Sequence, residues 1–312
     1  MSEMKWLVIL LSFLVSVPGA ATCKATVEAS QAKQRLRLQD PVAYQKRIQA
    51  DAQALQRCRQ SNFPQTQGIW LRLYPADALP GVLEPVLDRI VDLGYNQVFV
   101  EVFYDGRVLL PVSENKSPWR SVTLEAVQAG KLSPDTDLWQ MAVQKGKERG
   151  LKVYGWLFTL NFGYGYGENT DRLSVIARNG RGESSISRAQ FSPAEGKDGR
   201  SFYLPLTETE HLFVDPYHPQ ARADLQQVVQ QLLKAKPDGM VFDYIRYPLT
   251  SPRMNDQVEN LWIYGQASRQ ALLAKTRHGE ERAQLEEYLD RGGNDLNFWE
   301  KVTEHAYNGV LE

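Results

Sequence analysis

The sequence predicts an α/β fold built on a parallel sheet, and three observations lead to this prediction. Four short apolar runs occur in the middle of the chain, segments with apolar residues at helical spacing separate them, and these segments end in glycine or proline. Mostly apolar strands that alternate with helices are typical of parallel β/α units. With 312 residues, 43% of them apolar, the chain is long enough for one large domain and an extension.

The first 22 residues have the pattern of an export signal. Lys5 precedes the apolar run 6–17, and Pro18 and small residues follow it. The run is too short to span a bilayer comfortably, so a cleaved signal peptide over 1–22 is the first interpretation. An uncleaved anchor and a lipoprotein signal, with the lipid on Cys23, are the alternatives, and only these would attach the protein to a membrane. We therefore expect export to the periplasm or the extracellular space, with envelope association under those alternatives.

Residues 23–65 are expected to form a helical extension and a linker. Apolar residues recur at helical spacing up to about residue 60, and Asp40 is placed to cap a helix that begins at Pro41. A breaker-rich stretch, "SNFPQTQG", follows. The two cysteines, Cys23 and Cys58, can form one disulfide in an oxidising compartment, whereas lipid on Cys23 would leave Cys58 free.

The main domain, 66–312, is expected to start with alternating strands and helices. The loop after the third strand is about 50 residues long, and we expect a small hairpin at 201–214 within it. No glycine fingerprint follows the first strand, so dinucleotide binding has little support. An open doubly wound sheet and a barrel are the remaining alternatives. The predicted strands are 68–74, 96–103, 151–160 and 238–247, and the predicted helices between them are 79–95, 135–150 and 218–237.

The predicted strands are too few to form a closed barrel. A (β/α)8 barrel needs four more strands after Pro248, at roughly 30 residues per unit. The rest of the chain instead has helical patterns, at 256–276, 279–293 and 295–307. The chain then holds half a barrel, is a fragment of a longer protein or has another architecture, and we favour the fragment.

Two neighbouring motifs carry a resemblance to a known family. "DPYHPQAR" at 215–222, followed about twenty residues later by "DGMVFDYIRYP" at 238–248, resembles the glycosyl-hydrolase-like 10 family of exported bacterial proteins, in particular its cyanobacterial type. The similarity covers about residues 66–250. It implies a (β/α)8 TIM-barrel core, here with only the first half present and the C-terminal part incomplete.

The resemblance also implies an activity. It predicts a glycosidase that cleaves O-glycosidic bonds in a cell-envelope or extracellular polysaccharide, for example the glycan strands of peptidoglycan. A non-catalytic glycan-binding or scaffold protein on the same fold is the alternative. Two departures favour that alternative, because Tyr244 stands where the family commonly has a second Asp, and Phe158 stands where it often has Asn.

Glycoside hydrolysis needs two carboxyl groups, and in a barrel they come from the carboxyl ends of strands. Asp243, at the end of the fourth strand, is the candidate nucleophile or general base, and a structural pair with Arg246 is its alternative role. Glu101 lies in the apolar second strand, so it is either functional or paired with Arg72. We expect the general acid beyond residue 312, with Glu101 as the fallback partner.

Further polar and aromatic residues at predicted strand ends are candidate substrate contacts. Aromatic rings stack on sugar faces, whereas polar groups bind hydroxyls or a sugar carboxylate. For Asp215 an Asx turn or helix cap is the stronger alternative. The substrate-binding candidates are Trp156, Tyr164, Tyr244, Arg246, Asn161, His218 and Asp215.

Other function classes find no support in the sequence. The formal net charge of −1 does not favour nucleic-acid binding. The four histidines have no ligand spacing, and serine-hydrolase and zinc motifs are missing, so neither a metal nor a cofactor is expected. The expected partner is a polysaccharide or oligosaccharide, and the sugar, the linkage and the oligomeric state are left open.

Overall fold

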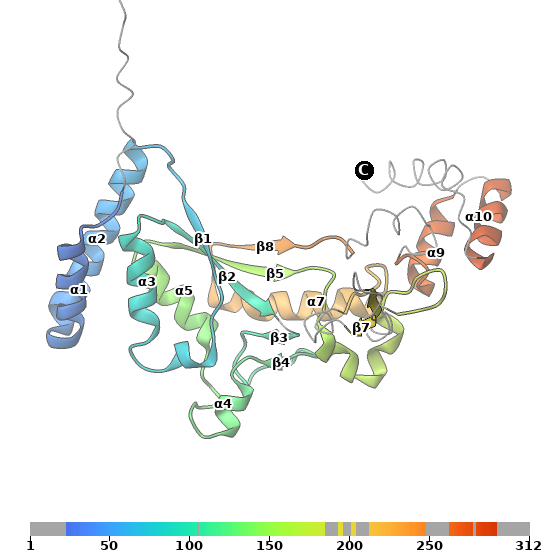
Figure 1. Ribbon diagram of the computed structural model, residues 1–312, viewed down its shortest axis with the longest axis horizontal. Coiled ribbons are helices and arrows are strands. Elements are labelled where there is room, and N and C mark those ends of the chain that lie inside the picture. The colour runs from blue at the N-terminus through green and yellow to red at the C-terminus, as the bar shows by residue number, and fades with distance from the viewer. Residues whose placement is uncertain are drawn as a thin grey trace, which may run out of the picture.

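The computed structural model describes residues 23–104, 106–184, 193–195, 201–203, 212–247, 262–276 and 279–291. These residues form an α/β fold with a mostly parallel sheet (Figure 1). The predicted signal peptide, 1–22, and the predicted last helix, 295–307, lie outside the described residues.

Two helices form where the helical extension was predicted, α1 (Val27–Gln39) and α2 (Pro41–Ser61). Asp40 caps α2 as predicted, since its Oδ1 accepts hydrogen bonds from the backbone N–H groups of residues 42 and 43, at 3.1 and 3.0 Å. Pro41 occupies the first turn, where its missing N–H has no partner to lose.

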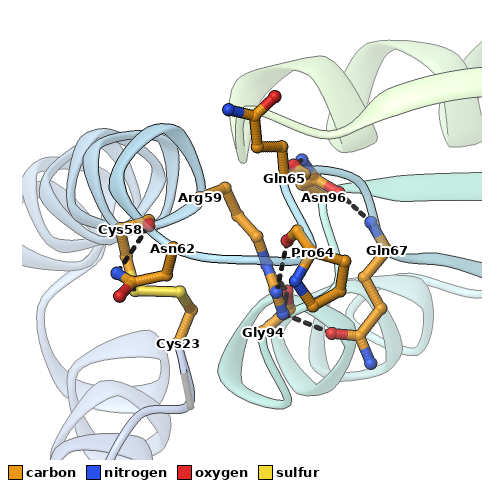
Figure 2. Close-up of a disulfide and its surroundings, with 9 residues drawn as sticks. All are labelled: Cys23, Cys58, Arg59, Asn62, Pro64, Gln65, Gln67, Gly94 and Asn96. Carbon is orange, nitrogen blue, oxygen red and sulfur yellow. Dashed lines mark hydrogen bonds between the residues drawn. A yellow bond between two sulfur atoms is a disulfide. The ribbon is translucent and has the colours of Figure 1, made fainter. Parts of the chain in front are cut away.

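A disulfide ties the start of the described chain to α2. Cys23 and Cys58 are bonded, as in the disulfide alternative (Figure 2). Next to it, the guanidinium of Arg59 donates to the backbone oxygens of Gly94, at 2.8 Å, and Pro64, at 2.9 Å. These bonds hold α2 against the turn that leads into the second strand.

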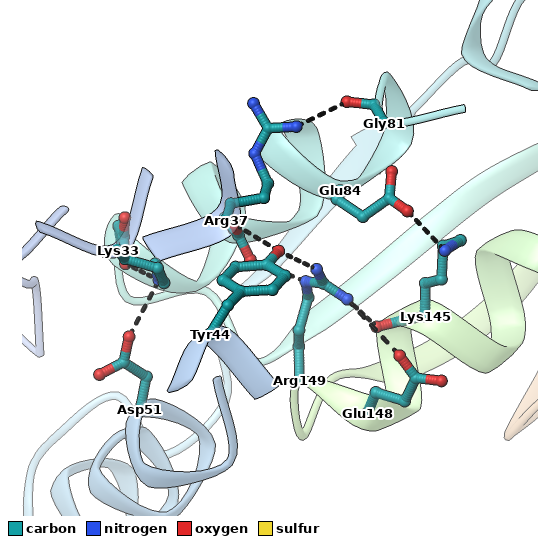
Figure 3. A network of polar contacts seen from close by, with 11 residues as sticks. Lys33, Arg37, Tyr44, Asp51, Gly81, Glu84, Lys145, Glu148 and Arg149 are labelled. Atoms are coloured by element: carbon teal, nitrogen blue, oxygen red, sulfur yellow. Dashed lines mark hydrogen bonds and ion pairs between the residues drawn. The ribbon is translucent and has the colours of Figure 1, made fainter. Parts of the chain in front are cut away.

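Buried charged groups dock the extension onto two helices of the main domain, α3 (Leu83–Asp92) and α5 (Leu138–Glu148). Arg149 donates to the hydroxyl of Tyr44 at 2.6 Å (Figure 3). Arg149 also donates to Asp88 at 2.8 Å, and the Tyr44 hydroxyl donates to Asp88 at 2.9 Å. Lys33, only 1% exposed, pairs with Asp51 at 3.0 Å and with Asp92. Because each of these buried charges has a partner of opposite sign, their attraction offsets the cost of removing them from water.

Four parallel strands follow each other in the sheet in the order of the sequence. They are β1 (Gly68–Leu71), β2 (Gln97–Tyr104), β5 (Lys152–Phe158) and β8 (Gly239–Asp243), and they confirm the four predicted strands. Each pairs in parallel with the next. A doubly wound sheet reverses its strand order at a switch point, and no such reversal occurs among these four described strands.

Helices α3, α5 and α7 (Pro219–Leu232) cover one face of this sheet (Figure 1). On the two central strands, β2 and β5, the side chains on that face are almost fully buried in the main core, and they alternate along each strand with side chains on the other face. The buried set includes Val98, Val100, Val153 and Leu157. A short 3-10 helix, Leu233–Ala235, continues α7.

Smaller elements complete the fold, and the two-residue strands among them are too short to show a sequence period. Next to β2 lie β3 (Arg107–Val108) and β4 (Arg120–Ser121), followed by α4 (Leu124–Gln128). The predicted hairpin is displaced: β7 (Ser201–Tyr203) pairs with the preceding β6 (Pro193–Glu195).

Two helices lie near the end of the described chain, α9 (Gln266–Lys275) and α10 (Gly279–Arg291). The predicted helix 256–276 was too long at its start, since Trp262–Gly265 are not helical. Trp262 is instead 4% exposed in a small core with Phe213.

Candidate functional site

The carboxyl ends of the parallel strands bring the predicted carboxylates to one edge of the sheet. Glu101 of β2 lies opposite Trp156 of β5, and Asp243 of β8 lies opposite Phe158. Since side chains two residues apart on a strand share a face, all four point away from the helix layer. The strand register therefore places both carboxylates on the same face of one sheet.

Both oxygens of Asp243 accept hydrogen bonds. The indole N–H of Trp156 donates to Oδ2 at 2.8 Å, and the backbone N–H of Tyr244 donates to Oδ1 at 2.7 Å. Asp243 forms no ion pair with Arg246, whose guanidinium lies over the ring of Tyr244 at 5.0 Å. Within the described part of the chain, the structural alternative for Asp243 is thus not formed, and its carboxylate is oriented by an aromatic donor.

Tyr244 has an unusual backbone conformation directly after the candidate carboxylate. Its φ is +48°, in the left-handed region that favours glycine, so this residue is strained. Its ring is 40% exposed and packs edge-on against Phe158 at 4.4 Å. The strand ends here, and an exposed ring stands beside Asp243.

Glu101 is held by Arg72, which was one of its two predicted roles. The guanidinium binds both carboxylate oxygens, with Nε at 2.5 Å from Oε2 and Nη2 at 3.1 Å from Oε1. Glu101 is 4% exposed, and Arg72 also lies over the ring of Tyr104 at 4.8 Å. A two-pronged ion pair of this kind fixes the orientation of the carboxylate.

A row of aromatic rings crosses the same face, nearer the amino ends of the strands than these carboxylates. Its first member, Trp70, was not identified from the sequence. Trp70 stacks on Phe99 at 5.0 Å, and Phe99 stacks on Tyr154 at 5.2 Å. Trp70 is 60% exposed although it lies within a strand. The signal that could have revealed it is the alternation of Trp70 with the two aliphatic residues that flank it in "GIWL".

Asp215 has a structural role in the described chain. Its Oδ1 accepts from the Ser268 hydroxyl at 2.6 Å and from the backbone N–H of Tyr217 at 3.0 Å, and its Oδ2 accepts from the Ser268 N–H at 2.9 Å. The carboxylate therefore forms the expected turn and also caps the distant α9. It is 1% exposed, so these contacts bury it.

Three other candidates lie in loops and helix starts. His218 caps α7, since its Nδ1 accepts from the backbone N–H of Gln220 at 3.2 Å. The Asn161 oxygen accepts from two backbone N–H groups, both at 3.1 Å, so it organises the loop after β5. Tyr164 is 43% exposed at the start of the short helix Tyr164–Glu168. Within the described residues, none of the three bonds to Asp243.

Neither a metal centre nor a membrane span occurs in the part of the chain that the structure describes. No three side chains of His, Cys, Asp or Glu come together there as ligands for a metal ion. Among the same residues, no helix combines the length and apolar character that crossing a bilayer requires.

Comparison with known proteins gives one distant relationship. No family model matches the chain. "Glycosyl hydrolase DigH" of Escherichia coli (strain K12) is 27% identical over 206 residues, which are 62% of this chain and 42% of that protein, and DigH of Shigella flexneri matches equally. The chain thus spans less than half the length of these curated relatives. They support a glycosyl-hydrolase-like relationship.

One solved structure was also found. The crystal structure of a hypothetical protein from Ruminiclostridium thermocellum ATCC 27405 has a TM-score of 0.37 and 15% identity, and the match covers 58% of this chain and 78% of that one.

Proposed function

We propose that this protein is a glycoside hydrolase of the TIM-barrel type that cleaves a cell-envelope or extracellular polysaccharide. The observation that carries the proposal is the position of Asp243, an oriented carboxylate at the carboxyl end of a parallel strand, in a chain similar to proteins named glycosyl hydrolase. Sequential parallel strands with helices on one face are the arrangement from which such barrels are built.

Asp243 is proposed as the nucleophile or general base. A carboxylate in either role must be held in one orientation toward the sugar ring. The indole N–H of Trp156 supplies that orientation from the neighbouring strand. The exposed ring of Tyr244 stands next to the carboxylate and is placed to stack on a sugar, while Arg246 behind it offers donors to hydroxyl or carboxylate groups.

The second carboxyl group is the open part of this mechanism. Glu101 lies two strands from Asp243, and its register position is two residues nearer the amino ends of the strands. Strand spacings of about 4.8 Å and a rise of about 3.3 Å per residue put their Cα atoms roughly 12 Å apart. Both of its carboxylate oxygens are also bonded to the Arg72 guanidinium, so neither is directed at a sugar bound beside Asp243. We therefore assign Glu101 to shaping the site and place the acid outside the described residues.

Export is proposed on two grounds. The first 22 residues have the sequence pattern of a signal peptide, and the disulfide between Cys23 and Cys58 is stable in an oxidising compartment. A polysaccharide substrate of the envelope is accessible from there, and peptidoglycan glycan strands are the first substrate to test.

One observation favours a second function, that of a non-catalytic glycan-binding protein. Of the two carboxylates on this face of the four strands, one is neutralised by Arg72. Such a protein would use the rings of Trp156 and Tyr244 for stacking and would have no working pair of carboxyl groups.

The test compares Asp243→Asn with Asp135→Asn, a matched change at an exposed position outside the proposed site. Purified protein is incubated with peptidoglycan glycan strands and with a panel of extracellular polysaccharides, and released reducing ends are measured. The proposal expects at least about 100-fold less hydrolysis for Asp243→Asn and no change for Asp135→Asn. Equal hydrolysis by both variants removes Asp243 from the mechanism. Glycan binding without hydrolysis by the unchanged protein selects the second function.

A further inference from the structure

The helical extension carries a charge opposite in sign to that of the rest of the chain. Residues 23–61 contain eight Lys and Arg and three Asp and Glu, which is a formal charge of +5. The whole chain carries −1, so the residues outside the extension together carry −6. Such an asymmetry between parts of one chain indicates that the basic part meets an anionic surface or polymer.

The carboxylates of the extension do not neutralise its exposed cations. Asp51 is held by Lys33 at 3.0 Å and by Arg47 at 2.8 Å, and Asp40 caps α2. Glu28 lies in the first turn of α1, at the end of that helix away from the turn between α1 and α2. The exposed cations of the extension are Lys24, Arg35, Lys46 and Arg57.

Two exposed apolar side chains stand beside two of these cations at the turn between the helices. Leu38, 76% exposed, follows Arg35 by three residues on α1, and Val42, 67% exposed, precedes Lys46 by four on α2. Residues three or four apart lie on the same face of a helix, so each apolar side chain shares a face with a cation. We call these four residues the basic tip.

The main domain holds the basic tip in place. Arg37, next to Leu38, donates to the backbone oxygen of Gly81 at 2.9 Å (Figure 3). The extension lies at the amino ends of the strands, since a Cβ at Gly150, just before β5, would lie 2.9 Å from the Cβ of Ala52. A surface that is already ordered loses little conformational freedom on binding. Docking at the tip also leaves Asp243, at the carboxyl end of β8, out of the contact.

We propose that the extension docks the protein on an anionic phospholipid surface. Leu38 and Val42 insert between the headgroups, and the exposed cations of the extension meet the phosphates. A bilayer offers both acyl chains and phosphates, whereas a soluble polyanion uses the cations alone. Each cation near such a surface contributes about fivefold to binding, so the contact is reversible and depends on salt. This inference goes beyond the proposed function and does not rest on it.

The experiment measures co-sedimentation of the oxidised protein with vesicles of phosphatidylcholine, with and without about 30% phosphatidylglycerol, at about 50 and 500 mM salt. The full chain and the chain from Cys23 onward are compared, so that the apolar run 6–17 cannot account for the result. We expect binding at least about tenfold tighter to the anionic vesicles, and weaker binding at high salt.

Two double variants test the basic tip. Arg35→Glu with Lys46→Glu should weaken binding to anionic vesicles at least about tenfold. Lys116→Glu with Lys131→Glu makes the same change in net charge at exposed positions outside the extension, and should leave binding unchanged. Leu38→Ser with Val42→Ser changes no charge and should weaken binding about tenfold. Circular dichroism and a disulfide assay verify that each variant is folded.

Three results would overturn the proposal. The first is equal binding to both kinds of vesicle, or none at low salt. The second is an equal effect of the two Glu pairs, because the tip would then have no special part in binding. The third is unchanged binding by the Ser pair together with equal affinity for soluble polyphosphate, which would make the extension a site for a soluble polyanion. None of these measurements uses hydrolysis, so they do not bear on the proposed function.

Discussion

Removing the disulfide between Cys23 and Cys58 should destabilise the protein by a calculable amount. The bond closes a loop with a sequence separation of 35 residues. In the chain-entropy treatment, a loop of this length lowers the entropy of the unfolded chain by about 13 cal/mol/K, or about 4 kcal/mol at 25 °C. The double substitution Cys23→Ser with Cys58→Ser should therefore lower the free energy of unfolding by about 4 kcal/mol.

The assay is urea unfolding of the oxidised protein, the reduced protein and the double Ser variant, followed by Trp fluorescence and circular dichroism. With a slope of about 3 kcal/mol/M, the loss corresponds to a fall in the midpoint of about 1.3 M. Reduced protein and double variant should agree, because each lacks only the covalent link. Arg59 is left unchanged, so its bonds to the Gly94 turn act in all three samples.

Two results would refute this reasoning. A midpoint that falls by less than about 0.3 M would mean that the link does not constrain the unfolded chain. An unchanged midpoint with much faster amide hydrogen exchange in α1 and α2 would mean that these helices unfold separately from the sheet. In that case the buried ion pairs of Figure 3 would not couple the extension to the main domain.

Three further predictions concern buried polar groups. Lys33→Met leaves the buried Asp92 without its cation and should lower the free energy of unfolding in urea by about 3–5 kcal/mol. The double substitution Lys33→Met with Asp92→Leu should restore most of this loss. Burial raises the pKa of Tyr44, so above about pH 10 the unfolded chain loses a proton that the folded protein keeps. The free energy of unfolding should therefore fall as the pH rises past about 10. Thermal melts at several pH values should show a smaller fall for Tyr44→Phe than for the unchanged protein. Asp215→Ala should cost about 1–3 kcal/mol and speed amide exchange in α9, whereas unchanged stability with lost glycan binding would make Asp215 a substrate contact.

The regular elements were predictable because their signals are local. The Asp40–Pro41 pair marks a helix start by its own chemistry, and the four apolar runs were long enough to show as strands. The start of α9 was not predictable in this way. It is set at Gly265 by Asp215, 50 positions earlier in the chain, whose Oδ2 would lie 2.5 Å from a Cβ at that glycine. No pattern within the helix itself carries that information.

The candidate site was predictable in place but not in its bonding. The end of the fourth apolar run located Asp243 correctly at a strand end. Whether Asp243 pairs with Arg246, and whether Glu101 pairs with Arg72, depended on the backbone turn at Tyr244 and on strand register. The Trp156 donor lies 87 positions from Asp243, a contact that only the folded sheet creates.

The way the chain enters the fold fixes which end of the molecule can be attached to a support. Cys23 packs on the turn at Gly94, and the N–H of Ala25 donates to the backbone oxygen of Asp92 at 2.8 Å. This turn leads into the amino end of β2, and Asp243 lies at the opposite, carboxyl end of the sheet. A bead or fusion partner joined at Cys23 would therefore be attached at the amino ends of the strands, opposite to Asp243. The Asp243 end would then point away from the support.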